Sequence, residues 1–369
     1  QIAAKSVKIS NAKLDENEVH TIVVGESYDF NRKLSPSKST DKTYWYILDE
    51  EYAEVDSSGV VTAKKAGITT LVAKVGIDRV SAEESTNKVV DSVRLNIVSP
   101  KETSADKFTY TIMNDGTVCI TGCDNSLTEV VIPSMIEGKV VTEIGEWAFA
   151  YCSNLRSIKL PDSVTSIGKQ AFYDCISLTS IDLSEGITSI GYNTFYGCIS
   201  LTSIEVPEGV TSIDLSGCIS LTNIDLPKSV TSVEFSDCVS LTNIDLPEGV
   251  TEIEFLNCRN LTSIKLPKSV TRIENYAFQY CSSLTSIELP QSLTYIGEDV
   301  FYGCSSLTSI EIPKSVTSMG FVDPYEEVSE ELMDIFRNCP SLKTIIVTAG
   351  SYADRWARRV GHEDKLIRK

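Results

Sequence analysis

Residues 161–183 read PDSVTSIGKQAFYDCISLTSIDL, and the chain repeats this unit with small changes from residue 108 onward. Each copy contains L-x-x-I-x-L, then Pro or Ser, then V-T-x-I, and most copies add G-x-x-x-F-x-x-C. A unit of this length cannot bury its own apolar residues, whereas stacking it on its neighbours makes a continuous core. The repeat therefore predicts a solenoid with a capping segment over each end.

One cysteine marks each turn of the predicted solenoid. The spacing is 23 residues in the outer copies, 20 residues from Cys198 to Cys258, and 35 residues in the last step. We call this set the cysteine column: Cys123, Cys152, Cys175, Cys198, Cys218, Cys238, Cys258, Cys281, Cys304 and Cys339. The ligands of a metal site must converge on one point, and cysteines spaced one per coil do not. Cysteines on neighbouring coils point in the same direction, which places their Cβ atoms too far apart for ordinary disulfides. Packed thiols are the favoured interpretation, with rung-to-rung disulfides and a Cys119–Cys123 disulfide as open alternatives.

The residues on either side of the central isoleucine in L-x-x-I-x-L should point away from the core, because alternate residues of a strand share a face. They are predicted to tile a concave sheet. Four consecutive carboxylates in this set form what we call the first acidic row: Asp182, Glu205, Asp225 and Asp245. The complete candidate binding face comprises Lys159, Asp182, Glu205, Asn223, Asp225, Asn243, Asp245, Lys265, Glu288 and Glu311. Three interpretations remain open: a solvated acidic face, a surface for a basic or calcium-bridged partner, and paired catalytic carboxylates.

The 20-residue copies replace G-x-x-x-F with a simple alternation of apolar and acidic residues, as in TSVEFSDC. This alternation predicts that the second strand is longer there, so the middle of the array should be β-helix-like and less curved. Leu215, Phe235 and Phe255 should then occupy the place that phenylalanine holds in other copies. The intervening carboxylates, which we call the second acidic row, should face solvent: Asp214, Glu234 and Glu254.

Residues 5–99 follow a different pattern of short alternating apolar runs, such as HTIVV, TYWYIL and TTLVAKV, separated by turn signals. About seven strands without a helical period indicate an antiparallel β-sandwich. A hairpin insertion is possible in the irregular segment IDRVSAEESTNKVVDS, residues 77–92. In the repeat region, an acidic insertion at 321–335 offers Ser329 as the N-cap of a short helix.

Each of the two regions resembles a known protein family. The words VVGESYDF and TYWYILDEEYAEVDSSGVVTAKKAG resemble the bacterial immunoglobulin-like group 2 module, and the repeats resemble the BspA-like leucine-rich repeats of bacterial surface proteins. The resemblance implies a mainly β chain. Its parts are an immunoglobulin-like β-sandwich at 1–99, a linker at 100–107, and a right-handed leucine-rich-repeat solenoid at 108–369 with caps at 108–133 and 348–369.

The amino-acid composition argues against several classes of function. The chain has 51 acidic and 33 basic side chains, a formal charge of -18, which disfavours nucleic acid as a partner. No apolar run approaches the roughly 20 residues needed to cross a bilayer. Only His20 and His362 could act as histidine bases, and the sequence contains no phosphate-binding loop, nucleophile elbow or metal-ligand cluster.

We therefore expect a non-enzymatic, secreted or bacterial cell-surface binding protein that needs no cofactor or metal. The resemblance implies adhesion for some members of the family, so the expected partner is an extracellular protein or glycan. The sequence is compatible with a monomer. Two alternatives remain: a structural stalk or coat protein without a specific ligand, and a glycan-processing enzyme that uses acidic pairs.

Overall fold

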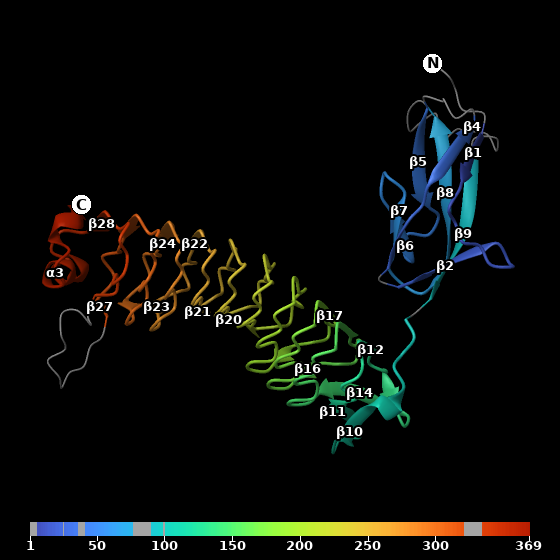
Figure 1. Cartoon of the computed structure of the whole chain (residues 1–369), viewed down its shortest axis with the longest axis horizontal. Coiled ribbons are helices and arrows are strands. Elements are labelled where there is room, and N and C mark those ends of the chain that lie inside the picture. Colours follow the sequence, from blue (N-terminus) through green and yellow to red (C-terminus); the bar gives the residue numbers. More distant parts are fainter. Residues whose placement is uncertain (1–5, 25, 36–40, 77–89, 99, 321–333) are drawn as a thin grey trace. The chain divides into compact units, whose positions relative to one another are not determined.

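The computed structural model describes residues 6–24, 26–35, 41–76, 90–98, 100–320 and 334–369. The chain divides into two compact units, Gln1–Lys101 and Glu102–Lys369 (Figure 1). The expected hairpin insertion at 77–92 lies mostly outside the described residues, and so does the expected helix after Ser329.

The first unit is the predicted β-sandwich, although its strands 19–23 and 90–98 pair in parallel and not in the expected antiparallel orientation. One sheet has the strand order β2-β9-β8-β5, and a second has the order β3-β7-β6. The strands are β1 (Ser6–Ile9), β2 (Val19–Val23), β3 (Ser27–Asp29), β4 (Arg32–Ser35), β5 (Lys42–Ile47), β6 (Ala53–Val55), β7 (Val60–Ala63), β8 (Gly67–Gly76) and β9 (Val90–Val98). Trp45 packs against the buried core, and it lies so close to Gly59 that a Cβ there would be 2.7 Å from the ring. Because Gly59 also has a φ of 105°, only glycine suits this turn.

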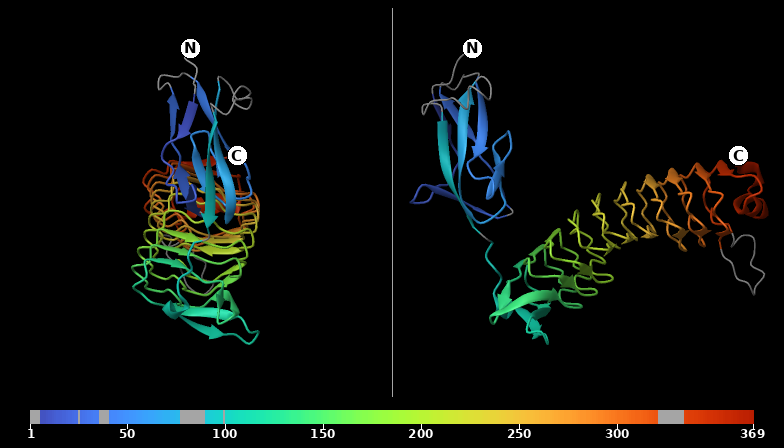
Figure 2. Two further views of the ribbon diagram at one scale, coloured as in Figure 1. Left: turned by 90° about the vertical axis from the view of Figure 1, so that its right-hand side faces the viewer. Right: turned by 180° about the vertical axis from the view of Figure 1, so that it is seen from behind.

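The second unit is a solenoid whose coils stack along its length (Figure 2). Each coil contributes a second strand from V-T-x-I or its equivalent, and the coils outside the middle of the array also contribute a first strand from L-x-x-I-x-L. The first strands are β12 (Glu129–Val131), β15 (Ser157–Lys159), β17 (Ser180–Asp182), β22 (Ser263–Lys265), β24 (Ser286–Glu288), β26 (Ser309–Glu311) and β28 (Thr344–Val347). The second strands are β14 (Lys139–Ile144), β16 (Ser166–Ile167), β18 (Ser189–Ile190), β19 (Ser212–Asp214), β20 (Ser232–Glu234), β21 (Glu252–Glu254), β23 (Arg272–Ile273), β25 (Tyr295–Ile296) and β27 (Ser318–Met319).

The 20-residue coils have the longer second strand that their sequence predicts. Strands β19, β20 and β21 each have 3 residues, whereas the flanking β18 and β23 have 2. They form one parallel sheet in register. In the same coils, however, the L-x-x-I-x-L segments at 203–205, 223–225 and 243–245 form no regular strands.

The loss of strand pairing on one side of the middle coils affects the curvature of the solenoid. A stack that stays hydrogen-bonded on one side and is unbonded on the other is free to bend toward the bonded side. In Figure 1, β20, β21 and β23 follow the lower, inner edge of the arc, whereas β22, β24 and β28 follow the upper edge. The expectation that the middle of the array is less curved is therefore wrong, because it ignored the first strands.

The core of the solenoid is a continuous column of aromatic rings. Phe149, Phe172 and Phe195 stack at 5.2 and 5.7 Å between ring centroids, and Phe235 and Phe255 continue the column at 5.6 Å. Leu215 fills the position between these two groups, and its side chain is fully buried. The prediction that leucine or phenylalanine takes this place in the short coils is confirmed.

Both ends of the solenoid are covered. The antiparallel pair β10 (Phe108–Ile112) and β11 (Val118–Cys123) forms the first cap, and β13 (Met135–Ile136) pairs with β14. Residues 102–107 were expected to be part of a linker, but they belong to the solenoid unit: Thr103 N donates to Val131 O at 2.8 Å. At the other end, helix α3 (Tyr352–Arg359) packs beside the last coil, and a strand that the sequence did not predict, β29 (Leu366–Arg368), pairs with β28.

Candidate binding surface

The first acidic row is fully on the surface, as predicted. All four carboxylates are exposed, and so are Asn223, Asn243, Lys265, Glu288 and Glu311; Lys159 is half-buried. The ends of this face are neutralised within the chain. Lys159 Nζ lies 2.6 Å from Asp182, Lys265 Nζ lies 3.7 Å from Glu288, and Lys369 Nζ lies 2.8 Å from Glu311.

The middle of the same face differs from its ends. Glu205, Asp225 and Asp245 have no ion-pair partner in the part of the chain that the structure describes. They also lie on the segments without regular strand pairing. The prediction of a continuous concave sheet beneath the row is therefore wrong in two respects. The backbone of this face forms no regular strands in the middle coils, and the first strands β22, β24 and β28 follow the outer edge of the bend and not its concave side (Figure 1).

The second acidic row is aligned as predicted, because Asp214, Glu234 and Glu254 are register partners in β19, β20 and β21. The prediction that all three face solvent is wrong for Asp214, which is only 6% exposed. Its two carboxylate oxygens accept hydrogen bonds from Asn193 N at 2.9 Å and Ser216 N at 3.0 Å. Asp214 stands where a 23-residue coil meets the first 20-residue coil, and it satisfies a backbone N–H of each.

Glu234 is half-buried between its two neighbours. Burial first, and then the charges of Asp214 and Glu254, raise the pKa of Glu234 to about 7. The Glu254 carboxylate accepts a hydrogen bond from Ser236 Oγ at 2.9 Å. Beside these residues lies a shallow depression of about 410 Å³. Its charged lining residues are Glu234, Glu252, Glu254, Arg272 and Glu274.

Sequence reasoning missed Glu252, Arg272 and Glu274 in this depression. Glu252 and Arg272 occupy the place that serine holds in most copies, and Glu274 occupies the place of the usual glycine. These departures from the repeat were the available signal. The Arg272 side chain is already engaged, since its Nε lies 2.8 Å from Glu274 and its guanidinium lies 4.1 Å from the ring centroid of Tyr295.

The titration of Glu234 leads to a testable prediction. Its pKa in the folded state is above the ordinary value of 4.5, so the folded protein binds this proton more tightly, and stability falls as the pH rises toward about 7 and above. Glutamine cannot ionise. We therefore expect Glu234→Gln to stabilise the solenoid at pH 8 by about 1 kcal/mol after allowance for solvent screening, an increase in Tm of about 2–4 °C. Thermal unfolding followed by circular dichroism at pH 4 and pH 8 measures this.

The exposed Asp245→Asn serves as the matched control, with little change expected at either pH. A Glu234→Gln stabilisation of equal size at pH 4 and pH 8 would contradict the prediction, because the effect would then not arise from ionisation.

The cysteine column has one repeated geometry. From Cys175 onward, each thiol donates to the backbone carbonyl of the phenylalanine, or of Leu215, one coil earlier, as in Cys175 to Phe149 O at 3.0 Å and Cys258 to Phe235 O at 3.1 Å. All eleven cysteines of the chain are free thiols. Burial raises the pKa of Cys218, Cys238 and Cys258 well above the ordinary value. These three buried thiols are therefore unreactive, and the column packs and hydrogen-bonds successive coils together.

The first rung differs from the rest. Cys123 Sγ lies 3.1 Å from Cys152 Sγ, and Cys152 also contacts the Asn125 side chain at 3.3 Å. Cys123 thus begins the column, as the sequence predicts. Cys119 lies outside the column and is buried, which raises its pKa to about 11.

The two histidines occupy separate structural sites. His20 packs against Tyr28 at 4.3 Å between ring centroids, in the sandwich. His362 Nε2, in the C-terminal cap, contacts Asp334 of the last coil at 2.9 Å, and Cys339 lies in that coil. Burial raises the pKa of Cys339 to about 12, so its thiol is not an effective nucleophile at neutral pH. Among the residues that the structure describes, no group of three or more His, Cys, Asp or Glu is arranged to hold a metal ion.

Comparison with known protein families identifies the family of the repeat. The profile of the BspA type leucine rich repeat region matches residues 116–234 and 215–322, with 6 copies, which is more than half of the chain. The chain belongs to the BspA-type leucine-rich repeat family. The profile of the bacterial Ig-like domain (group 2) matches residues 4–84. Both sequence resemblances are thereby confirmed. BspA-type repeat proteins are surface proteins, and this membership supports a binding or structural role.

Several solved structures are similar to this BspA-type chain. A leucine-rich repeat protein of T. pallidum is 31% identical, with 56% of this chain and 91% of that chain covered and a TM-score of 0.41. A leucine-rich cell surface protein of Faecalibacterium prausnitzii is 24% identical over 72% and 98% of the two chains, with a TM-score of 0.36. A leucine-rich repeat protein of Eubacterium ventriosum is 25% identical over 67% and 71%, with a TM-score of 0.42.

No curated protein matches the chain. Among the described residues, none of the helices has the length and apolar character required to cross a membrane.

Proposed function

We propose that this BspA-type chain is a non-enzymatic, secreted or cell-surface binding protein, adhesin-like in its role, whose first acidic row contacts an extracellular protein or glycan. The observation that carries the proposal is the contrast within one face. Its ends are ion-paired inside the chain, whereas Glu205, Asp225 and Asp245 are exposed and unpaired among the described residues.

Electrostatics favours a cationic group on the partner. At the spacing of hydrogen-bonded strands, about 4.8 Å, two carboxylates repel each other by about 0.9 kcal/mol in bulk water and by roughly 3.5 kcal/mol at an effective dielectric constant of 20. The middle coils are not paired on this face, so these values are an upper bound for Glu205, Asp225 and Asp245. Solvent tolerates this repulsion on an open face. A lysine, an arginine or a bridging cation brought by the partner converts the repulsion into attraction, and the gain grows as the interface excludes water.

The test is binding to immobilised extracellular matrix proteins and glycan arrays by wild type and by the triple variant Glu205→Gln/Asp225→Asn/Asp245→Asn. We expect the variant to lose at least about tenfold in affinity for a ligand that wild type binds, because the loss of a desolvated charge pair costs 2 kcal/mol or more. Ligand binding that is unchanged in the triple variant would remove the row from the binding surface.

A matched control removes the same number of negative charges from a neighbouring exposed column. The variant Asp162→Asn/Glu185→Gln/Glu208→Gln should retain wild-type affinity, since its residues lie after the first strands and not on them. Equal losses in both variants would indicate a general charge effect.

A stalk or coat role is the second candidate, favoured by the immunoglobulin-like unit that precedes the repeats. It predicts that no ligand on either array binds above background.

A further inference from the structure

The turns that follow β14, β16 and β18 carry a cluster of surface aromatic side chains. Trp147 and Tyr151 are 42% and 58% exposed, and their rings are stacked with centroids 6.3 Å apart. Tyr173 lies 5.6 Å from each of them, and Tyr196 stacks on Tyr173 at 5.1 Å. Four rings from three successive coils therefore form one continuous group.

The turn geometry does not require these aromatic residues. Trp147 and Tyr151 have φ angles of 60° and 61°, a left-handed conformation that is unfavourable for bulky side chains and tolerated best by Gly, Asn and Asp. Most other coils use polar residues: Gln170, Asn193 and Asp299 at the position of Trp147, and Asp174, Asp237 and Asn257 at the position of Tyr151. One other coil has aromatic residues at both positions, Tyr276 and Tyr280. The fold thus accepts small polar residues here, so Trp147 and Tyr151 retain backbone strain that the turn itself could avoid.

An exposed apolar column continues the cluster. Ile176, Ile199 and Ile219 each follow a cysteine of the column and are 42%, 38% and 39% exposed. They are aligned coil by coil, because Ser200 Oγ donates to Ile176 O and Ser220 Oγ donates to Ile199 O, both at 2.6 Å. We call the combined surface the aromatic strip: Trp147, Tyr151, Tyr173, Tyr196, Ile176, Ile199 and Ile219. Exposed apolar surface of this kind, rich in Trp and Tyr, is typical of protein interfaces.

The charge around the aromatic strip favours a cationic partner. The whole chain has a formal charge of -18. Asp174 adjoins Tyr173, and its carboxylate lies over the next turn, since a Cβ added to Gly197 would be 2.1 Å from Asp174 Oδ1. The strip therefore presents ring faces and edges together with a carboxylate.

The same chain shows which group this combination binds. In the C-terminal coils, the guanidinium of Arg337 lies 5.2 Å from the ring centroid of Tyr302 and is held by both oxygens of Asp299 at 2.7 and 2.6 Å. Tyr302 follows its phenylalanine directly, as Tyr173 and Tyr196 do. On the aromatic strip, no cation–ring contact is present among the residues that the structure describes. Arginine suits such a site better than lysine, because its planar guanidinium stacks on a ring while it hydrogen-bonds a carboxylate.

We propose that the aromatic strip is a docking surface for an arginine-bearing segment of a protein partner. The proposal goes beyond the function proposed above, since the strip lies on the turns after the second strands and shares no residue with the first acidic row.

The experiment titrates the full chain with acetylated hexa-arginine amide in 150 mM NaCl and follows tryptophan fluorescence. Trp147 is the reporter, because Trp356 is 5% exposed and Trp45 packs in the sandwich core. We expect a saturable change that disappears in Trp147→Asn, and a several-fold weaker response to hexa-lysine. Tyr151→Asn should lower the affinity for hexa-arginine at least about tenfold.

Two matched variants make the result specific. Tyr280→Asn makes the same change at the equivalent strained position of another coil, where φ is 60°, and should bind as wild type. The triple variant of the first acidic row should also bind as wild type, so failure of the row and failure of the strip are distinguishable. Thermal unfolding should place Tyr151→Asn within about 3 °C of wild type, since the relief of strain offsets the lost stacking.

The proposal is overturned if hexa-arginine leaves Trp147 fluorescence unchanged, if Tyr151→Asn binds as tightly as wild type, or if hexa-lysine binds equally well. If Tyr151→Asn proves unstable, Asp174→Asn replaces it, because Asn occupies the same position in the coil of Asn257. Loss of the arginine preference in that variant supports the proposal, and its retention contradicts it.

Discussion

Phe255→Ala is expected to lower the free energy of unfolding of the solenoid by about 3–5 kcal/mol. The Phe255 side chain is fully buried, and its ring lies 5.6 Å from Phe235 and 5.5 Å from Phe278. Removing it leaves a cavity and two unstacked rings. Because a coil is stabilised mainly by its two neighbours, the loss weakens the interfaces on both sides. Urea unfolding followed by far-ultraviolet circular dichroism measures the effect.

The chain supplies its own control for this substitution. Leu215 fills the same place in another short coil, so Phe255→Leu should cost less than about 1.5 kcal/mol. If alanine and leucine at position 255 destabilise equally, the column of rings is not the source of the stability.

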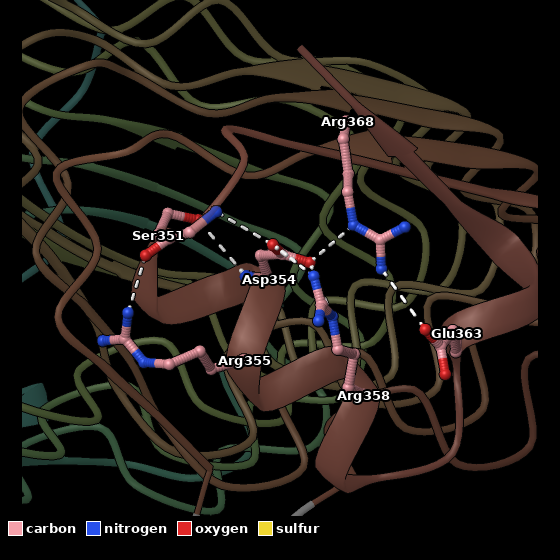
Figure 3. Close-up of polar contacts among 7 residues, drawn as sticks. Ser351, Asp354, Arg355, Arg358, Glu363 and Arg368 are labelled. Atoms are coloured by element: carbon pink, nitrogen blue, oxygen red, sulfur yellow. Dashed lines mark hydrogen bonds and ion pairs between the residues drawn. The ribbon is translucent and has the colours of Figure 1, made fainter.

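Asp354→Ala should destabilise the C-terminal cap by about 2–4 kcal/mol. Figure 3 shows the Asp354 carboxylate at the centre of the cap, and it is 1% exposed. It accepts from Gly350 N at 2.9 Å, from Arg358 at 3.0 Å and from Arg368 at 2.9 Å. Arg368 lies on β29, so this carboxylate ties helix α3 to the closing strand. Removing it takes this partner from Arg358 and leaves Arg368 with Glu363, whose carboxylate lies 3.7 Å away.

The pH dependence distinguishes this mechanism from simple loss of packing. The hydrogen bond from Gly350 N, followed by the bond and charge of Arg368 and the charge of Arg358, holds the pKa of Asp354 below its usual value of 3.8. Its contribution is therefore present above that value and is lost as the pH falls through the lowered pKa. Stability curves of wild type and Asp354→Ala should converge in acid and diverge toward neutrality. The exposed Asp364→Ala, in the same cap, should change stability by less than about 0.5 kcal/mol at any pH. A difference that does not vary with pH would contradict the ionic mechanism.

The repeat made most of the solenoid predictable from sequence. Because every coil repeats the same alternation, one unit predicts which side chains enter the core, and the buried positions of Phe235, Phe255 and the cysteine column follow directly. Periodicity failed where coils of different length meet. Asp214 alternates like an outward residue, yet it is buried because its partner, Asn193 N, lies 21 residues earlier in a longer coil.

Other features depend on geometry that the repeat does not encode. The loss of first-strand pairing in the middle coils is a property of the stack and not of any one copy, since those copies keep L-x-x-I-x-L or a close variant of it. The sequence reads Trp147 and Tyr151 as ordinary aromatic residues. Their strain and exposure are visible only once the left-handed turn is known. Strand β29 was missed because its three residues lie in a segment that otherwise predicts a helix.

The unpaired first-strand segments at 203–205, 223–225 and 243–245 also set how the array should respond to force. Coils joined by hydrogen bonds on both faces resist separation more stiffly than coils joined on one face. We therefore expect these three coils to act as the elastic element of the solenoid. Under tension they should extend first and return when the load is released, while the coils near the ends, where first and second strands each pair with a neighbouring coil, stay intact.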